Sequence, residues 1–435
     1  MHLPSYYSSS GAGPSSSSIL LPPSYTQRPN ALEETIENTP SEPSYSGSFV
    51  KRTKDATIAI FNQEDDASLP VYGAHGDIRG EIVPRRRETV VSVDLKLEGS
   101  MSTMTTSGGR IVPILRQTHS LYRRSPRSTR GPPELCPSIV PFDLRMPLRF
   151  RHTELGRELH LPPTLRVSLR EDKNTKSDLL YANVEYSLVL SIEHHVSLLG
   201  LKVAKSTESF RIPFSYLPRT RPSSPAIDRP LRRSLKCQPN EWCQISSRIQ
   251  ALDPAMGALD LDLFTPSIRV YPIGASIRFH LHAYGTLLAI RELHRLITAW
   301  HAGLAPVPMK VTLMRQWAVT PSSAKRTVHN VEISEAKSRP LPPSIDSEEP
   351  GMDGGTATID WDGEIPLERA AVGETGSFDA GHLLAEDYVS VSFQPDPSLA
   401  SKLSPHAFYY PIRLVSHPWI QSDVFDDDHE YLFSR

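Results

Sequence analysis

The stretch Val-Glu-Tyr-Ser-Leu-Val-Leu-Ser-Ile-Glu at residues 184–193 decides the fold class of this chain. Large apolar side chains occupy every second position from Val184 to Ile192, and glutamate and serine fill most positions between them. A period of two is typical of a β-strand with one buried face and one face in water. The same pattern recurs at residues 91–98 and 210–216. Similar short runs occur at 57–61, 69–83, 111–116, 164–169, 268–271, 277–283, 310–317, 328–333, 357–361, 388–393 and 408–415.

Many short strands with almost no helix predict an all-β fold of two consecutive immunoglobulin-like β-sandwiches. The break between them falls at residues 218–238, where four prolines lie close together in the sequence and cannot continue a sheet. We therefore expect an N-terminal sandwich over residues 55–217 and a C-terminal sandwich over residues 239–420. A chain of 435 residues has room for two such domains and their tails.

Both ends of the chain are expected to lie outside the sandwiches. Residues 1–54 are rich in serine and proline and poor in apolar residues, so they cannot bury enough surface to offset the entropy of ordering. We predict a disordered N-terminal tail there and an acidic tail at residues 421–435. Within the second sandwich, the Pro-, Gly- and acid-rich stretch 334–356 is too long for a hairpin turn and predicts a mobile loop.

Residues 286–301 depart from the β pattern. Their apolar side chains recur at steps of three and four, as on one face of a helix, at Leu287, Ile290, Leu293, Ile297 and Trp300. We expect a helical insert that packs on the edge of the sandwich. A helix that binds a partner protein is the alternative.

The composition narrows the class of protein. The net charge of −2 generates no overall field, so we expect no nucleic-acid partner. Three scattered cysteines exclude a disulfide framework, and no apolar stretch reaches about 18 residues, so we expect a cytoplasmic protein.

The sequence contains no motif that predicts an enzyme. It contains no Gly-x-Ser-x-Gly, phosphate-binding loop, His-Glu-x-x-His or Cys-x-x-Cys motif, so we expect no catalytic residue and no cofactor. His280 and His282 would share one side of a strand, but no acidic or cysteine partner lies near them in the sequence. We therefore expect no metal site.

A Pro-Pro-x-Tyr peptide in the tail is the first candidate site. In Leu21-Pro22-Pro23-Ser24-Tyr25 the two prolines already hold the polyproline conformation, which lowers the entropy lost on docking into an aromatic-lined groove. We predict that Pro22, Pro23 and Tyr25 bind a WW domain. Glu42-Pro43-Ser44-Tyr45 is a weaker copy that would add avidity if tandem WW domains engaged both.

Two arginine clusters are the second candidate site. The first consists of Arg85, Arg86 and Arg87, and the second begins with Arg123 and Arg124. We expect them to contact anionic lipid head groups or phosphorylated cargo tails, because guanidinium groups pair well with phosphate. A solvated charged face without a ligand is the alternative.

Over residues 55–418 the chain resembles the fungal-type α-arrestins. The motifs that carry the resemblance occur in the same order as in that family. They are 71–83 (VYGAHGDIRGEIV), 212–216 (IPFSY), 239–242 (PNEW), 263–274 (LFTPSIRVYPIG), 388–394 (YVSVSFQ) and 408–417 (FYYPIRLVSH). The resemblance implies the arrestin fold for both sandwiches.

α-Arrestins link membrane cargo to WW-domain ubiquitin ligases through Pro-Pro-x-Tyr motifs. The resemblance therefore implies a non-catalytic adaptor that recruits a WW-domain HECT ubiquitin ligase through Pro22, Pro23 and Tyr25. Its cargo would be the cytosolic tails of membrane transporters or receptors, and the adaptor would be recruited from the cytoplasm to the plasma membrane or endosomes. The alternative is an arrestin-fold vesicle-sorting scaffold, similar to that of the retromer, which needs no ligase.

Overall fold

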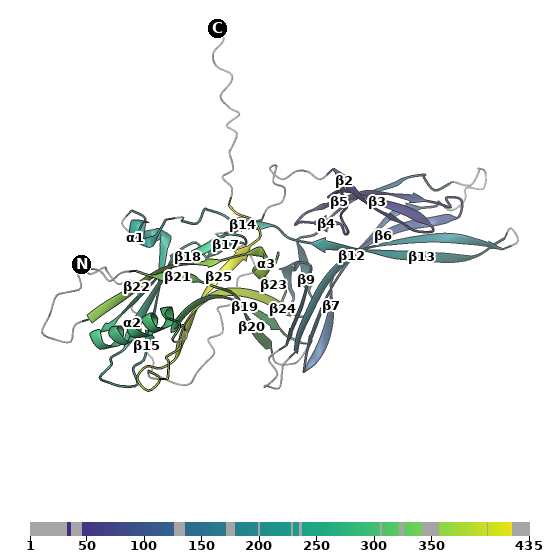
Figure 1. Cartoon of the computed structure of the whole chain (residues 1–435). Helices are drawn as coiled ribbons and strands as arrows, with labels where there is room; N and C mark the ends of the chain where they lie inside the picture. Colours follow the sequence, from purple (N-terminus) through teal and green to yellow (C-terminus); the bar gives the residue numbers. More distant parts are fainter. Residues whose placement is uncertain are drawn as a thin grey trace, which may run out of the picture.

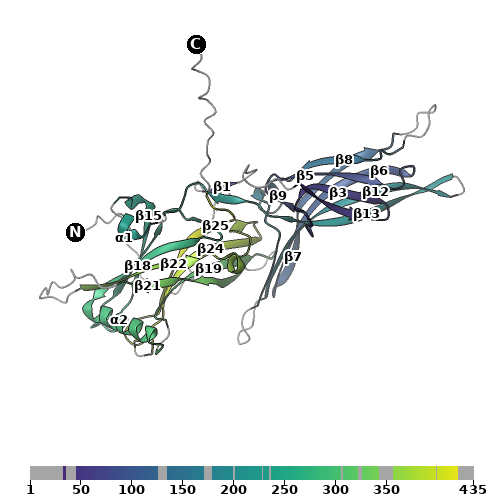
Figure 2. The same cartoon turned by 45° about the horizontal axis from the view of Figure 1, so that its top comes forward.

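A computed structural model gives the structure of the chain. It describes residues 33–35, 46–125, 135–170, 179–198, 201–227, 229–234, 237–304, 307–321, 326–341, 356–397 and 399–419. Most of these residues lie in antiparallel β-sheets, as predicted. Figures 1 and 2 show two elongated β lobes that meet near the middle of the molecule.

The N-terminal lobe consists of two main sheets. One contains, in order, β2 (Gly47–Arg52), β3 (Ala56–Gln63), β5 (Asp77–Pro84) and β8 (Val140–Arg145). The other contains, in order, β4 (Val71–Tyr72), β13 (Leu201–Tyr216), β12 (Leu179–Leu198), β6 (Val90–Thr105) and β7 (Gly108–Arg123). Strand β11 (Leu165–Arg170) also pairs with β12, and β9 (Arg149–His152) pairs with β10 (Arg157–His160).

Strand β12 shows why the alternating sequence folds this way. It lies between β6 and β13, and its side chains at Tyr186, Leu188, Leu190 and Ile192 are almost completely buried. These side chains share one core with isoleucines from β3 and β5 of the opposite sheet. The two sheets therefore form a sandwich around the apolar face that the sequence pattern predicts.

The C-terminal lobe also consists of two main sheets. One contains β15 (Trp242–Ile249), β16 (Leu259–Pro266), β18 (Ser276–Thr286), β22 (Thr356–Pro366) and β21 (Lys337–Pro340). The other contains β17 (Val270–Pro272), β25 (His406–Val415), β24 (Leu383–Phe393), β19 (Met309–Val319) and β20 (Thr327–Glu335). The short β23 (Phe378–Asp379) pairs with β24.

The two lobes share one strand topology. The order β2-β3-β5-β8 corresponds to β15-β16-β18-β22, and the order β4-β13-β12-β6-β7 corresponds to β17-β25-β24-β19-β20. In each lobe a very short strand pairs in parallel with the last long strand, β4 with β13 and β17 with β25. Both short strands begin with Val-Tyr, and the tyrosines, Tyr72 and Tyr271, are buried. The C-terminal lobe therefore repeats the architecture of the N-terminal lobe.

The expected helix is present as α2 (Leu287–His301). Thr286 caps its start by accepting a hydrogen bond from the Ala289 backbone N–H, and the helix packs against β18 and β22. Its buried residues are Ala289, Ile290, Leu293, Leu296 and Ile297. Leu287 was expected in this stripe but is 42% exposed, because it lies in the first turn beyond the packed face. Among the described helices none has the length and apolar character to cross a bilayer.

Three expected boundaries differ from the observed elements. Strand β2 places residues 47–52 in the first sandwich, before the expected boundary at residue 55. In the connector, β14 (Thr220–Pro222) pairs with β1 (Glu33–Thr35) from the expected tail. In the expected loop 334–356, residues 337–340 form β21 on β22, whereas residues 342–355 lie outside the described part of the chain.

A buried ion pair links two strands inside the C-terminal lobe. Arg315 on β19 and Asp387 on β24 are direct cross-strand partners, and their side chains are 4% and 0% exposed. Arg315 donates from Nε at 2.7 Å and from Nη2 at 3.1 Å to the Asp387 carboxylate. The Ser377 hydroxyl donates to the same carboxylate at 2.7 Å, and Arg315 also donates to the Val372 carbonyl at 3.0 Å. The buried carboxylate is therefore neutralised and hydrogen-bonded.

The lobes share apolar and polar contacts where they meet. The core of the N-terminal lobe includes five residues from the C-terminal lobe: Trp317, Val319, Ala380, Leu383 and Ala385. Beside them the rings of His152 and His382 lie 4.4 Å apart between centroids. Glu154 contacts His382 at 3.3 Å, and Arg157 contacts Asp379 at 3.8 Å. The junction is therefore a packed interface.

Candidate functional site

The Pro-Pro-x-Tyr candidate lies outside the described residues. Pro22, Pro23 and Tyr25 all belong to that part of the chain, and so does the weaker copy ending at Tyr45. WW-domain binding stays a prediction from the sequence.

The two arginine clusters come together in the N-terminal lobe. Arg85, Arg86 and Arg87 follow β5, while Arg123 ends β7 and Arg124 follows it. The Arg124 side chain donates through Nη2 to the Arg87 carbonyl at 3.3 Å and to the Glu88 carbonyl at 2.8 Å. We call these five arginines the arginine patch. Arg127 and Arg130 lie outside the described residues.

Three of the five arginines are tied to the protein itself. Arg86 Nη2 lies 2.5 Å from Asp55 Oδ1, and Arg87 Nε donates to the Cys136 carbonyl at 2.6 Å. Burial alone would raise the pKa of Asp55, but its hydrogen bonds, including the one from Arg86, hold the pKa below its usual value. Together with Arg124, these residues fix the backbone of the patch more than they offer charge to a ligand.

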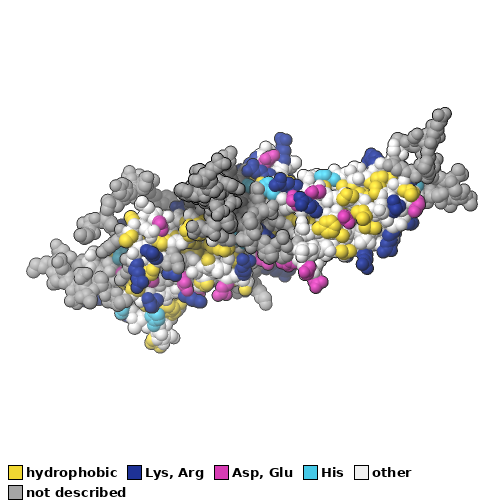
Figure 3. Space-filling view, turned by 90° about the horizontal axis from the view of Figure 1, so that it is seen from above, with side chains coloured by type: hydrophobic (Ala, Val, Ile, Leu, Met, Phe, Trp, Pro, Cys, Tyr) yellow, Lys and Arg dark blue, Asp and Glu magenta, His cyan; other side chains and the backbone are white. Residues whose placement is uncertain are grey.

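The remaining two arginines are the ones that can meet a ligand. Arg85 and Arg123 are exposed, and neither side chain has a hydrogen bond or ion pair to another described residue. Both guanidinium groups can therefore bind an oxyanion in bidentate fashion. Elsewhere the charges are mixed, and Figure 3 shows acidic and basic side chains interspersed over one face of the molecule.

The patch lies at the end of the N-terminal lobe that points away from the C-terminal lobe. Arg110, near the start of β7, pairs with Glu154 at the lobe junction, and Arg123 ends the same strand. Thirteen residues of extended strand span about 40 Å. A ligand on the patch would therefore be held far from the junction.

A second polar cluster, which sequence reasoning missed, lies on the outer face of the C-terminal lobe. His280 and His282 on β18 face Asp362 and Asp360 on β22. His280 Nδ1 lies 2.7 Å from Asp362 Oδ1, and its Nε2 lies 3.1 Å from Asp360 Oδ1. His282 Nδ1 lies 2.7 Å from the same Asp360 oxygen. We call these four residues the His–Asp cluster.

The cluster perturbs the charge states of its members. Burial alone would raise the pKa of Asp360, but hydrogen bonds from His280 and His282 hold it far below its usual value. Burial also opposes the charged form of His280, yet its bonds to Asp360 and Asp362 raise its pKa overall. The acidic partners of these histidines therefore come from β22 and not from residues near them in the sequence. The alternation Asp360-Trp-Asp362 was the available signal, but it lies 80 residues from His280.

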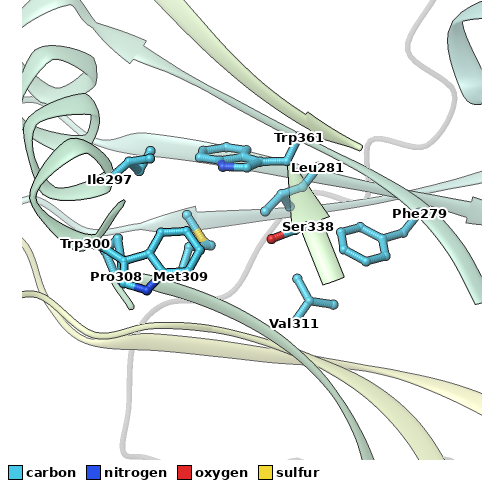
Figure 4. A pocket seen from close by; sticks show the side chains of 9 residues that line it. All are labelled: Phe279, Leu281, Ile297, Trp300, Pro308, Met309, Val311, Ser338 and Trp361. Carbon is cyan, nitrogen blue, oxygen red and sulfur yellow. The ribbon is translucent and has the colours of Figure 1, made fainter. Parts of the chain in front are cut away.

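An apolar pocket lies between α2 and the sheets of the C-terminal lobe. Figure 4 shows Ile297 and Trp300 of the helix beside Trp361 and Met309. The pocket has room for no more than about one water molecule. It is a packing gap and not a ligand site.

No model of a known protein family matches the chain, and a search of curated proteins finds no match.

Proposed function

We propose that this chain is a non-catalytic adaptor with the arrestin fold. It recruits a WW-domain HECT ubiquitin ligase to membrane protein cargo and so promotes ubiquitin-dependent endocytosis and sorting. The observation that carries the proposal is the repeated sandwich topology of the two lobes, each closed by a short parallel Val-Tyr strand.

The position of the family-like motifs supports the arrestin fold. The VYGAHGDIRGEIV stretch covers β4, the following turn and β5, and the LFTPSIRVYPIG stretch covers the end of β16, β17 and the following turn. Both stretches include the short parallel strand and the turn that follows it, which are equivalent in the two lobes. Motifs that resemble one family therefore fall on the structural repeat that defines the architecture.

The arrangement of sites supports an adaptor. The arginine patch lies at the end of one lobe, and the Pro-Pro-x-Tyr peptide precedes the first strand of the sandwich. A charged surface for cargo or membrane and a peptide for the ligase are separate features of one chain. An adaptor needs this separation, because it must hold two macromolecules at once.

Ligase recruitment is tested with the full chain and an isolated WW domain. Tyr25→Ala should abolish binding, because the tyrosine fills a pocket separate from the proline groove. Tyr7→Ala, in the same tail but outside the motif, is the matched control and should bind like the unchanged chain. Undiminished binding by Tyr25→Ala would show that the tail motif is not the WW-binding site. It would favour the sorting scaffold that acts without a ligase.

The cargo side is tested with vesicles containing anionic lipid and with a phosphorylated peptide. Arg85→Gln combined with Arg123→Gln should weaken binding to one of these probes, and binding by the unchanged chain should fall steeply with salt. Arg145→Gln is the control. Arg145 is exposed on β8 and pairs with Asp77 at the start of β5, whereas Arg85 follows the end of β5. Equal binding by both variants, or binding independent of salt, would contradict a role for the patch.

A further inference from the structure

The outer face of the β15-β16-β18-β22-β21 sheet carries an unusual set of ligand atoms. The donor atoms of His280, His282 and Asp360 all lie within 4.8 Å of one another. His280 is 5% exposed, whereas the His282 side chain is 29% exposed. One side of the cluster is therefore buried in the lobe, and the other side can be reached from solvent.

Neighbouring side chains fix the two imidazoles. The ring of His280 lies 5.9 Å from that of Phe264 on β16, and the ring of His282 stacks at 5.6 Å on that of Tyr284. Asp362 holds His280 at Nδ1, which leaves Nε2 directed toward Asp360. A carboxylate that accepts a hydrogen bond from the far nitrogen of a histidine is the usual support of a metal-ligating imidazole.

A third carboxylate lies beside the cluster with part of its bonding capacity unused. Asp262 on β16 is the direct cross-strand partner of His282 and is 7% exposed. Its Oδ1 is buried and has no hydrogen-bond partner among the described residues. A buried carboxylate oxygen without a partner is costly, because it loses hydration without compensation. A cation on this face would give that oxygen the electrostatic partner that it lacks.

The N-terminal lobe provides an internal comparison. The strands equivalent to β18 and β22 are β5 and β8, and there Arg79 contacts Asp143 at 3.1 Å and Asp77 at 3.0 Å. A guanidinium group satisfies the carboxylates in that lobe and cannot bind a metal. In the C-terminal lobe two imidazoles occupy the corresponding strand, and a neutral imidazole can bind a metal through the lone pair of one ring nitrogen.

We propose that the His–Asp cluster binds one divalent transition-metal ion of the zinc class through His280 Nε2, His282 Nδ1 and the Asp360 carboxylate. Asp362 orients His280, and Asp262 lies next to the remaining coordination position. Imidazole donors favour zinc and its neighbours over calcium or magnesium, which prefer oxygen ligands throughout.

The observed spacing suits this ion. Zinc–nitrogen bonds are about 2.0–2.1 Å, so two ligand atoms on a tetrahedral ion lie about 3.3 Å apart. His280 Nε2 and His282 Nδ1 now lie 3.1 and 2.7 Å from Asp360 Oδ1. Relative to this Asp360 oxygen, the imidazole nitrogens would have to move outward by about 0.2–0.6 Å to admit the ion. The bound ion would tie β18 to β22 on the outside of the lobe.

The test uses the full chain after treatment with a chelator and dialysis. Zinc content is measured by equilibrium dialysis and elemental analysis, and the coordination geometry by the visible absorption of added cobalt(II). The variants are His282→Gln and Asp360→Asn, with His294→Gln as control, because His294 is an exposed histidine on α2. Circular dichroism of the metal-free proteins checks that all variants fold.

We expect the unchanged chain and His294→Gln to bind one more equivalent of zinc than His282→Gln or Asp360→Asn. Zinc at about one hundred times its Kd should raise the unfolding temperature by about 3 °C, and only in the first two proteins. Asp362→Asn keeps all three direct ligands and should weaken affinity about 10–100-fold.

Equal zinc content in the unchanged chain, His294→Gln, His282→Gln and Asp360→Asn would place any bound ion elsewhere and overturn the proposal. So would a zinc-induced rise in unfolding temperature that persists in His282→Gln. Neither result bears on ligase recruitment, because Tyr25 and the WW domain take no part in the measurement.

Discussion

Removing Asp387 should destabilise the protein more than any surface substitution. Asp387→Ala leaves the Arg315 guanidinium buried at 4% exposure, with the Val372 carbonyl as its only hydrogen-bond acceptor among the described residues and the Trp317 ring at 5.8 Å. Breaking a buried ion pair by deleting one partner costs about 3–5 kcal/mol. The two lost hydrogen bonds to a charged group, at about 1.5–3 kcal/mol each, give a similar total.

The assay is urea unfolding followed by far-ultraviolet circular dichroism. With a slope of about 3 kcal/mol per molar urea, a loss of about 4 kcal/mol lowers the unfolding midpoint by about 1.3 M. The control is Arg315→Met combined with Asp387→Leu, which removes both charges and fills a similar volume. This double variant should recover most of the stability, because it leaves no unpaired charge. A loss below about 1 kcal/mol in Asp387→Ala, or equal losses in both proteins, would refute the reasoning.

Three further changes have expected outcomes. Burial lowers the pKa of His152 and His382, so both stay neutral in the folded protein; their stabilisation is present above about pH 6.5 and is lost as the pH falls. The unfolding temperature should therefore drop between pH 7 and 5, and less so in the doubly substituted His152→Gln, His382→Gln protein. Burial raises the pKa of Glu386 to about 7, so its stabilisation is lost as the pH rises; Glu386→Gln should raise the unfolding temperature at pH 8.5 and change little at pH 5. In Gly363→Ala the added methyl group would overlap the ring of Phe279 on the neighbouring strand, which should cost about 1–3 kcal/mol in a urea titration, and Phe279→Leu should recover part of it.

The sequence predicts individual elements well because alternation and helical spacing record which side of an element is buried. The stretch at 184–193 lies within β12, and the stripe at 286–301 became α2 with one register difference at Leu287. Strands β8, β15 and β16 were not predicted, and of these Trp242–Ile249 has only a weak alternation of large apolar and polar residues.

Strand neighbours could not be read from the same signal. Alternation does not say which strand lies beside which, so Asp360 could not be placed next to His280. That the two arginine clusters lie together could not be predicted from the sequence for a different reason. Arg124 bonds to the main-chain carbonyls of Arg87 and Glu88, and a carbonyl is present at every residue whatever its side chain.

The shared core at the lobe junction limits how the chain can be divided. Trp317, Val319 and Leu383 belong to the second half of the sequence, yet they complete the hydrophobic interior of the first. A fragment that stops in the connector would expose that interior to water and tend to aggregate. We therefore expect the two halves to melt in one cooperative transition. Proteins prepared for crystallisation or binding assays should stay soluble only when both halves are retained.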